Sequence, residues 1–113
     1  MSTETPQRWL TVPELVEILG IGVGQVRRLI EDRSLLASRV DGVLKVPAQF
    51  IRDGEAVSEL RGTLMVLADS GYTDEESMFW LLNVDESLGT TPITALLAGR
   101  KAEVRRVAQA LGF

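Results

Sequence analysis

The fold of this chain is decided by residues 11–30, which read TVPELVEILGIGVGQVRRLI. The Thr11 hydroxyl can accept a hydrogen bond from a free N–H of a first helical turn, and Pro13 and Glu14 suit early helical positions. Gly20 can adopt a positive φ at little cost, so it can end this helix and let the chain reverse within about three residues. A second amphipathic helix follows directly. The stretch therefore predicts a helix-turn-helix.

The second helix of this pair has one apolar face and one polar face. Its apolar positions recur at the spacing of a single buried side of a helix: Val23, Val26, Leu29 and Ile30. Arg can donate to both acceptors of guanine, Gln can pair with adenine, and a glycine lets a helix approach a backbone closely. On the polar face we therefore expect four residues to enter the major groove of double-stranded DNA: Gly24, Gln25, Arg27 and Arg28.

A candidate β-hairpin follows the helix pair. The β-prone runs 35–40 and 43–47 flank Asp41-Gly42, a dipeptide typical of a two-residue turn in which both residues have positive φ. This hairpin would be a wing, with Arg39 and Lys45 flanking its tip within reach of a phosphate or a minor groove. The alternative interpretation is that the two helices form a plain α-hairpin and that the arginines lie on a solvated face. A β-hairpin that follows at winged-helix spacing favours DNA binding over this alternative.

Composition excludes several functional classes. The 113 residues suit one domain or two very small subdomains that share a core. The chain has no Cys and no His, so it lacks disulfides, thiolate metal ligands and the commonest general base. We therefore expect no catalytic residues, no metal and no cofactor. No long apolar run or signal-peptide pattern occurs, which predicts a cytoplasmic protein that is not in the membrane.

Charge is distributed unevenly along the chain. The net charge is -4, yet residues 21–52 carry +3 and residues 97–113 also carry +3. Residues 53–96 have one base against nine acids, a charge of -8. Positive charge thus concentrates on the expected reading helix and wing. Because few phosphates would be neutralised there, DNA binding should be modest and sensitive to salt.

The second half of the chain predicts four helices. Periodicity favours a helix from Val57 to about Ala68, with Gly71 as its stop. Thr73 and Glu76 form a capping-box pattern, so a new helix begins there. That helix carries residues 78–82, which are apolar all round and are therefore either central to the core, which we favour, or a contact surface for another chain.

Two further helices close the chain. A short one begins at Pro92 and ends near Gly99, and the last runs from about Arg100 to Leu111. On the last helix we expect the basic side chains to point outward: Arg100, Lys101, Arg105 and Arg106. They could form a second DNA contact, although a solvated face is favoured.

The expected fold class is mainly α with a small β-hairpin, a winged helix-turn-helix followed by a C-terminal helical bundle. The expected division is a flexible tail over residues 1–10, the winged helix-turn-helix over 11–53, and a helical subdomain over 54–113 packed on it. These patterns predict a role in transcription regulation through binding to duplex DNA.

The chain also resembles a small family of actinobacterial winged-helix DNA-binding proteins. The resemblance rests on Leu15 to Pro47, on residues 71–74 and 79–82, and on a closing segment like 92–96 and 104–110. The best-known member is a mycobacterial protein that a receptor-type Ser/Thr protein kinase phosphorylates on a tail threonine, with loss of DNA binding. The resemblance implies a similar role, with Thr3 and Thr5 as the tail threonines of this chain.

A second resemblance concerns the C-terminal half. Trp80-Leu81 followed by residues 88–96 is similar to the toxin-binding domain of certain bacterial antitoxins. This similarity implies that the C-terminal helices bind a partner protein, which is the alternative function: a protein-interaction module. An enzyme is the third hypothesis, but Asp74, Glu75 and Glu76 are better explained as helix-start residues.

Overall fold

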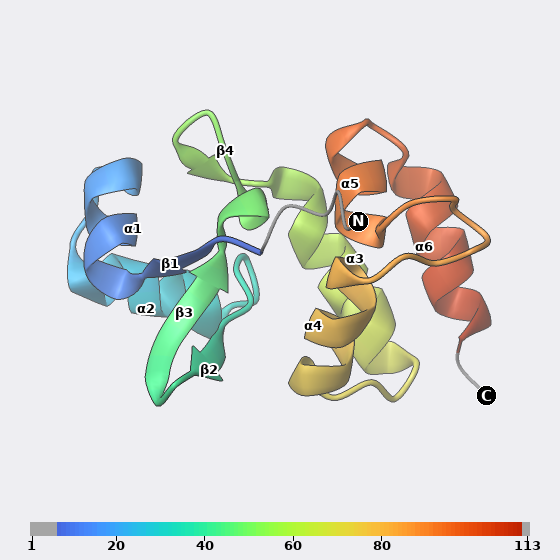
Figure 1. The fold of residues 1–113 in the computed structure, drawn as a ribbon, viewed down its shortest axis with the longest axis horizontal. Helices are drawn as coiled ribbons and strands as arrows, with labels where there is room; N and C mark the ends of the chain where they lie inside the picture. Colours follow the sequence, from blue (N-terminus) through green and yellow to red (C-terminus); the bar gives the residue numbers. More distant parts are fainter. Residues whose placement is uncertain (1–6, 112–113) are drawn as a thin grey trace, which may run out of the picture.

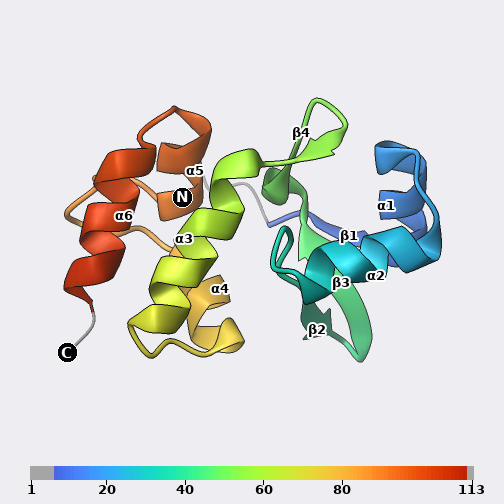
Figure 2. The same ribbon diagram turned by 180° about the vertical axis from the view of Figure 1, so that it is seen from behind.

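The computed structural model describes residues 7–111. Figure 1 shows two helices and a small sheet at one end of the molecule and the helices α3 to α6 at the other. The first two helices are α1 (Val12–Leu19) and α2 (Val23–Glu31). The remaining helices are α3 (Ser58–Asp69), α4 (Asp74–Leu82), α5 (Pro92–Leu97) and α6 (Lys101–Ala110). Figure 2 gives the reverse view, in which α2 and α6 again lie at opposite ends.

The larger sheet has three antiparallel strands in the order β1-β3-β2. These are β1 (Trp9–Thr11), β2 (Ser38–Val40) and β3 (Val43–Pro47). In this register Leu10 lies opposite Val46, and both side chains are buried. The sequence prediction of a flexible tail through residue 10 is therefore wrong for Trp9 and Leu10, because pairing with a distant strand orders them. Residues 1–6 of the predicted tail lie outside the described residues.

Two hairpins of the structure turn on an Asp-Gly dipeptide. Asp41 and Gly42 have φ values of 53° and 79°, which confirms the predicted two-residue turn between β2 and β3. Asp53 and Gly54, with φ values of 54° and 76°, join β4 (Ile51–Arg52) to β5 (Glu55–Ala56) after a short 3-10 turn, η1 (Ala48–Phe50). This second hairpin, residues 51–56, occupies the place where the sequence suggested only a boundary between subdomains.

The C-terminal helices begin where their caps predict. Thr73 accepts a hydrogen bond from the N–H of Glu76 at 3.2 Å, and Glu76 accepts one from the N–H of Thr73 at 2.9 Å, so α4 has the expected capping box. Thr91 caps α5 through its hydroxyl alone, which accepts from the N–H of Thr94 at 3.2 Å, with Pro92 as the first helical residue. Gly99, at a φ of 84°, follows the end of α5.

One hydrophobic core extends through both halves of the chain. Fully buried side chains from the first half, such as Leu15 and Phe50, belong to the same cluster as Leu96 and Val104 from the second. Near the end of the first half, η1 lies against α5 of the second half. The predicted fold class is thus confirmed, with small sheets added: a winged helix-turn-helix followed by a helical domain, α3 to α6.

Candidate nucleic-acid interface

The first helix of the pair is fixed at both ends by the predicted residues. The Thr11 hydroxyl accepts from the N–H of Glu14, and the N–H of Thr11 donates to the Glu14 carboxylate at 2.9 Å. These donated hydrogen bonds lower the pKa of Glu14, with a smaller contribution from the positive potential of Arg8 and Lys45. Gly20 ends the helix at a φ of 67°, as expected. The chain can therefore reverse directly into α2.

Helix α2 presents the expected polar face. The side chain of Val26 is fully buried, and the residues predicted to enter the major groove are all exposed: Gly24, Gln25, Arg27 and Arg28. Within residues 7–111, neither Arg27 nor Arg28 forms an ion pair. Val23 departs from the prediction because it is the first residue of the helix and remains 49% exposed. Periodicity shows which face is apolar but not how far along the helix the core extends.

Gln25 has a structural role that the sequence analysis missed. Its Oε1 accepts a hydrogen bond at 3.0 Å from the N–H of Gly22, the residue that caps α2. Gly22 has no side chain to cap the helix, and Gln at the third helical position can compensate from the other direction. The signal was present in the sequence as Gly22-Val23-Gly24-Gln25. Gln25 as a whole is exposed, as are Arg27 and Arg28.

The two basic residues of the wing lie on opposite faces of the sheet. Arg39 is opposite Leu44 across the β2–β3 pair, so these two side chains share one face, and Lys45 projects from the other. Arg39 is exposed, and its Nη1 donates to the carbonyl of Gly42 in the turn at 3.3 Å. Lys45 is half-buried and lies in register with Thr11 of β1. Arg39 is therefore nearer the tip than Lys45, whereas the sequence suggested that both flank it.

The turn that follows α2, residues 32–34, is held by the C-terminal helices. Arg61 of α3 donates from its Nε to the carbonyl of Asp32 at 3.2 Å. Arg33, which has a left-handed φ of 65°, forms an ion pair with Asp74 at the start of α4. Hydrogen bonds from Ser34 lower the pKa of Asp32, and Arg61 adds positive potential. Residues of α3 and α4, in the next domain, thus hold the C-terminal end of α2.

The second hairpin lies beside α2 and was missed in the sequence. A Cβ added to Gly54 would lie 3.6 Å from the carbonyl of Ile18, so the hairpin tip reaches the end of α1. An open groove of about 520 Å³ separates this hairpin from α2, with Gln25, Arg28 and Glu55 among its lining residues. The Asp53-Gly54 dipeptide carried the signal, but its flanking strands have only two residues each.

The basic residues of the last helix are less free than the sequence suggested. Arg100 is held by Glu103 at 2.7 Å and donates to the carbonyl of Leu88 at 2.9 Å. Arg105 is half-buried and crosses α3 at Gly62, where an added Cβ would lie 2.1 Å from its Nη2. The expected outward orientation holds for Lys101 and Arg106, which are exposed, and is wrong for Arg100 and Arg105. Arg100 thus connects the start of α6 to the loop before α5, and Arg105 packs across α3.

Two other features of residues 7–111 concern metal binding and membrane insertion. In this range no cluster of three or more acidic side chains is arranged to hold a metal ion. The helices of this range are also all too short or too polar to cross a membrane. The sites predicted for phosphorylation, Thr3 and Thr5, lie outside the described residues.

Two family models match the chain, one for each half. The model described as "DNA-binding protein Rv2175c, wHTH domain" matches residues 4–51. The model described as "Rv2175c C-terminal domain of unknown function" matches residues 57–112. Neither description names a catalytic activity. The first match covers the helix pair and the wing, and the second covers helices α3 to α6.

Known relatives agree with these models. The chain is 35% identical to the DNA-binding protein Rv2175c of Mycobacterium tuberculosis, over 90% of this chain and 79% of the relative. It is 40% identical to an excisionase of Streptomyces ambofaciens, over 50% of this chain and all of the relative. The NMR structure of Rv2175c superposes with a TM-score of 0.86 at 31% identity and covers all of this chain and 87% of the solved one.

The match in sequence, in fold and in domain order confirms the resemblance to the actinobacterial winged-helix proteins. The superposition extends over both halves of the molecule, and it therefore includes α2 and the wing. This chain belongs to the Rv2175c family, whose members join a DNA-binding winged helix-turn-helix domain to the Rv2175c C-terminal domain.

Proposed function

We propose that this chain is a transcription regulator that binds double-stranded DNA, with α2 in the major groove and the wing beside it. Residues 11–53 would bind the DNA, and residues 54–113 would form a helical unit packed on them. The observation that carries the proposal is the outward face of α2. Arg27 and Arg28 are exposed there and have no ion-pair partner within residues 7–111.

The roles of the individual residues follow from their chemistry. Arg27 and Arg28 would donate to guanine or to phosphates, and Gly24 would let the helix approach the DNA backbone. Gln25 would contribute its amide nitrogen, because its Oε1 already accepts from Gly22. On the wing, Arg39 would contact a phosphate, and Lys45 would add positive potential from the other face of the sheet. The names of the relatives support the same kind of ligand.

The test is the Arg27→Ala/Arg28→Ala double variant, measured by fluorescence anisotropy with a labelled duplex. Two lost charge-assisted contacts should weaken binding by at least about tenfold. Thermal stability should change little, because both side chains are exposed.

The matched control is the Lys101→Ala/Arg106→Ala double variant. It removes the same charge from exposed positions on α6, at the opposite end of the molecule (Figure 2). Its affinity should stay within about twofold of the parent chain. Equal losses in the two double variants would show that only net charge matters and would refute a specific face on α2.

We also propose that a Ser/Thr protein kinase regulates this binding through Thr3 or Thr5. The family resemblance supports this, and a phosphate near the basic surface would repel the phosphates of DNA. Incubation with a receptor-type kinase followed by mass spectrometry locates the modified residue. A chain that is fully phosphorylated at either threonine and binds the duplex with unchanged affinity would refute the proposed switch.

A further inference from the structure

The surface of α4 has aromatic side chains that the DNA-binding role does not use. The sequence analysis favoured the core for residues 78–82, and Met78 and Leu81 are indeed buried. Phe79, by contrast, is 70% exposed, and Val84 just after the helix is 69% exposed. Large apolar side chains that stay exposed next to polar ones are typical of a contact surface.

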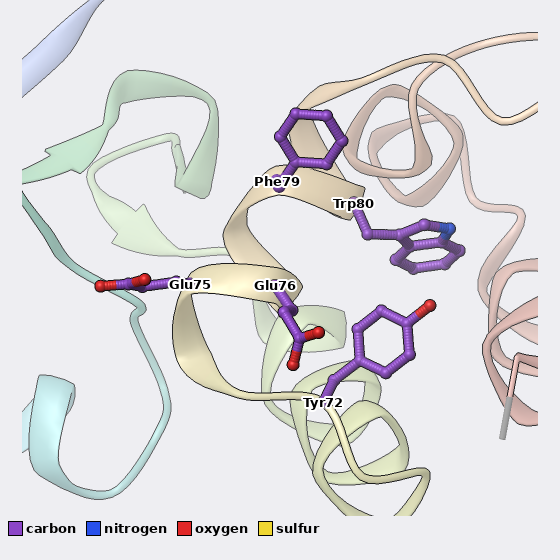
Figure 3. A pocket seen from close by; sticks show the side chains of 5 residues that line it. All are labelled: Tyr72, Glu75, Glu76, Phe79 and Trp80. Carbon is purple, nitrogen blue, oxygen red and sulfur yellow. The ribbon is translucent and has the colours of Figure 1, made fainter.

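Phe79 borders a defined groove. An open cavity of about 440 Å³ is lined by Tyr72, Glu75, Glu76, Phe79 and Trp80 (Figure 3), which we call the aromatic groove. In Figure 3 the carboxylate of Glu76 points toward the ring of Tyr72, and Trp80 projects on the same side of the helix. Glu75 points away from these rings. One carboxylate and two aromatic rings thus gather in one place.

Two residues of the aromatic groove, Trp80 and Glu76, are held by hydrogen bonds within the chain. The Nε1 of Trp80 donates to the Oδ2 of Asp85 at 3.0 Å. Glu76 is fixed by the capping box, and the hydrogen bonds from Thr73 lower its pKa, so its carboxylate is ionised at neutral pH. A second lone-pair-bearing oxygen of this carboxylate remains available to a ligand.

The charge around the groove selects the kind of occupant. Residues 62–99 contain six acidic residues and no Lys or Arg, and none of the residues lining the groove is basic. This potential repels nucleic acid and attracts a cation. Aromatic faces next to a carboxylate match a guanidinium or ammonium group, which can lie over a ring while it donates to the acid.

From this charge complementarity we infer that the aromatic groove docks a basic segment of a partner protein, with an Arg or Lys side chain between Tyr72, Glu76 and Trp80 and an apolar neighbour against Phe79. This inference is independent of DNA binding, because the groove and the face of α2 share no residue. It gives the C-terminal domain a role of its own.

The test uses a labelled decapeptide of alternating Arg and Leu, with an alternating Glu and Leu peptide as the charge control. Binding to the full chain is followed by anisotropy and by the indole N–H resonance of Trp80 in ¹⁵N-labelled protein. Trp9 is the only other tryptophan, so two indole signals are expected and Trp9→Phe assigns them. The Arg peptide should shift the Trp80 signal, and the Glu peptide should not.

Two variants change residues of the groove, and two control variants make the same kind of change outside it. Glu76→Gln removes the charge but keeps an oxygen for the capping box, and Glu86→Gln removes the same charge from an exposed position that does not line the groove. Phe79→Ala is matched by Met65→Ala on α3, where Met65 is 52% exposed. We expect at least about fivefold weaker peptide binding in the groove variants and less than about twofold in the controls.

Three outcomes would overturn the inference. An unmoved Trp80 signal on peptide binding would place the cation elsewhere. Equal losses for Glu76→Gln and Glu86→Gln would show attraction to net charge alone. Self-association of the peptide-free chain that Phe79→Ala abolishes, seen by sedimentation, would assign the groove to a second copy of the chain instead.

Discussion

The salt dependence of DNA binding follows from the few exposed cations of the proposed interface. Arg27 and Arg28 project from α2, and Arg39 projects from the wing. Lys45 is half-buried near Glu14 and is not counted. Each phosphate contact adds about -0.9 to the slope of log K against log salt, so three contacts predict a slope of about -2.7.

This slope translates into affinities that an assay can resolve. Between about 50 mM and about 200 mM salt, the parent chain should lose about 40-fold in affinity for a duplex. The Arg27→Ala/Arg28→Ala variant retains one contact, so its slope should be about -0.9 and its loss only about 3.5-fold. The contrast between the two chains separates lost phosphate contacts from a general loss of folding.

Anisotropy titrations of one labelled duplex at four salt concentrations give both slopes. The Lys101→Ala/Arg106→Ala variant should keep the parent slope, since its residues lie at the far end of the molecule. A parent slope that the α2 variant leaves unchanged would refute the assignment of these two arginines to phosphates, whatever happens to the affinity itself.

Three further predictions concern stability. Gly62→Ala should raise the stability by about 0.5–1 kcal/mol, because alanine favours a helix interior and the atoms that would clash form the guanidinium end of a long side chain, Arg105, whose buried Nε has no partner within residues 7–111. Thermal unfolding checks this, and a lower midpoint would contradict it. Leu96→Ala should cost about 2–5 kcal/mol in urea unfolding, because Leu96 is fully buried; a loss below about 1 kcal/mol would show a loosely packed site. The pKa of Glu76 is lowered from 4.5 by hydrogen bonds from Thr73, so its stabilisation is complete above that value and is lost as the pH falls through the lowered pKa. Glu76→Gln should therefore lose less stability than the parent chain between about pH 6 and about pH 3, and an equal loss would argue against the carboxylate as the cause.

Local signals made most of the helices predictable from the sequence. Thr11, Gly20 and Thr73 each act on atoms within four residues, and each has the predicted cap or turn role in the structure. Asp41-Gly42 likewise forms its turn without help from distant residues. Such signals are readable because the interaction and the residues that cause it lie in the same short stretch.

Features that depend on distant partners were not predictable. β1 has three residues, and its partner strand lies more than thirty residues further on. Arg105 looks like any solvated base on a helix, and only the missing side chain at Gly62 lets it cross α3. Periodicity also failed on α4, where residues 78–82 are all apolar and give no preferred face, so it could not distinguish exposed Phe79 from buried Leu81.

The composition of the candidate site was predicted from the sequence, whereas its arrangement was not. Periodicity identified the exposed face of α2, including Arg27 and Arg28. The predicted two-residue turn sets the register of the hairpin, so it implied that Arg39 and Lys45 lie on opposite faces of the sheet, but both residues were assigned to a single tip. The spacing of Gly22 and Gln25 likewise carried the signal that Gln25 caps its own helix, and periodicity alone did not reveal it.

The contacts that fix the turn after α2 limit which halves of family members can be joined in a chimera. Arg61 and Asp74 belong to the half matched by one family model, and the Asp32 carbonyl and Arg33 that they contact belong to the other. A chimera that joins the first half of this chain to the second half of a relative would carry these contacts only if the donor supplies both side chains. A chimera that keeps the DNA-binding half of this chain therefore also needs Arg61 and Asp74, or equivalent side chains, in its second half.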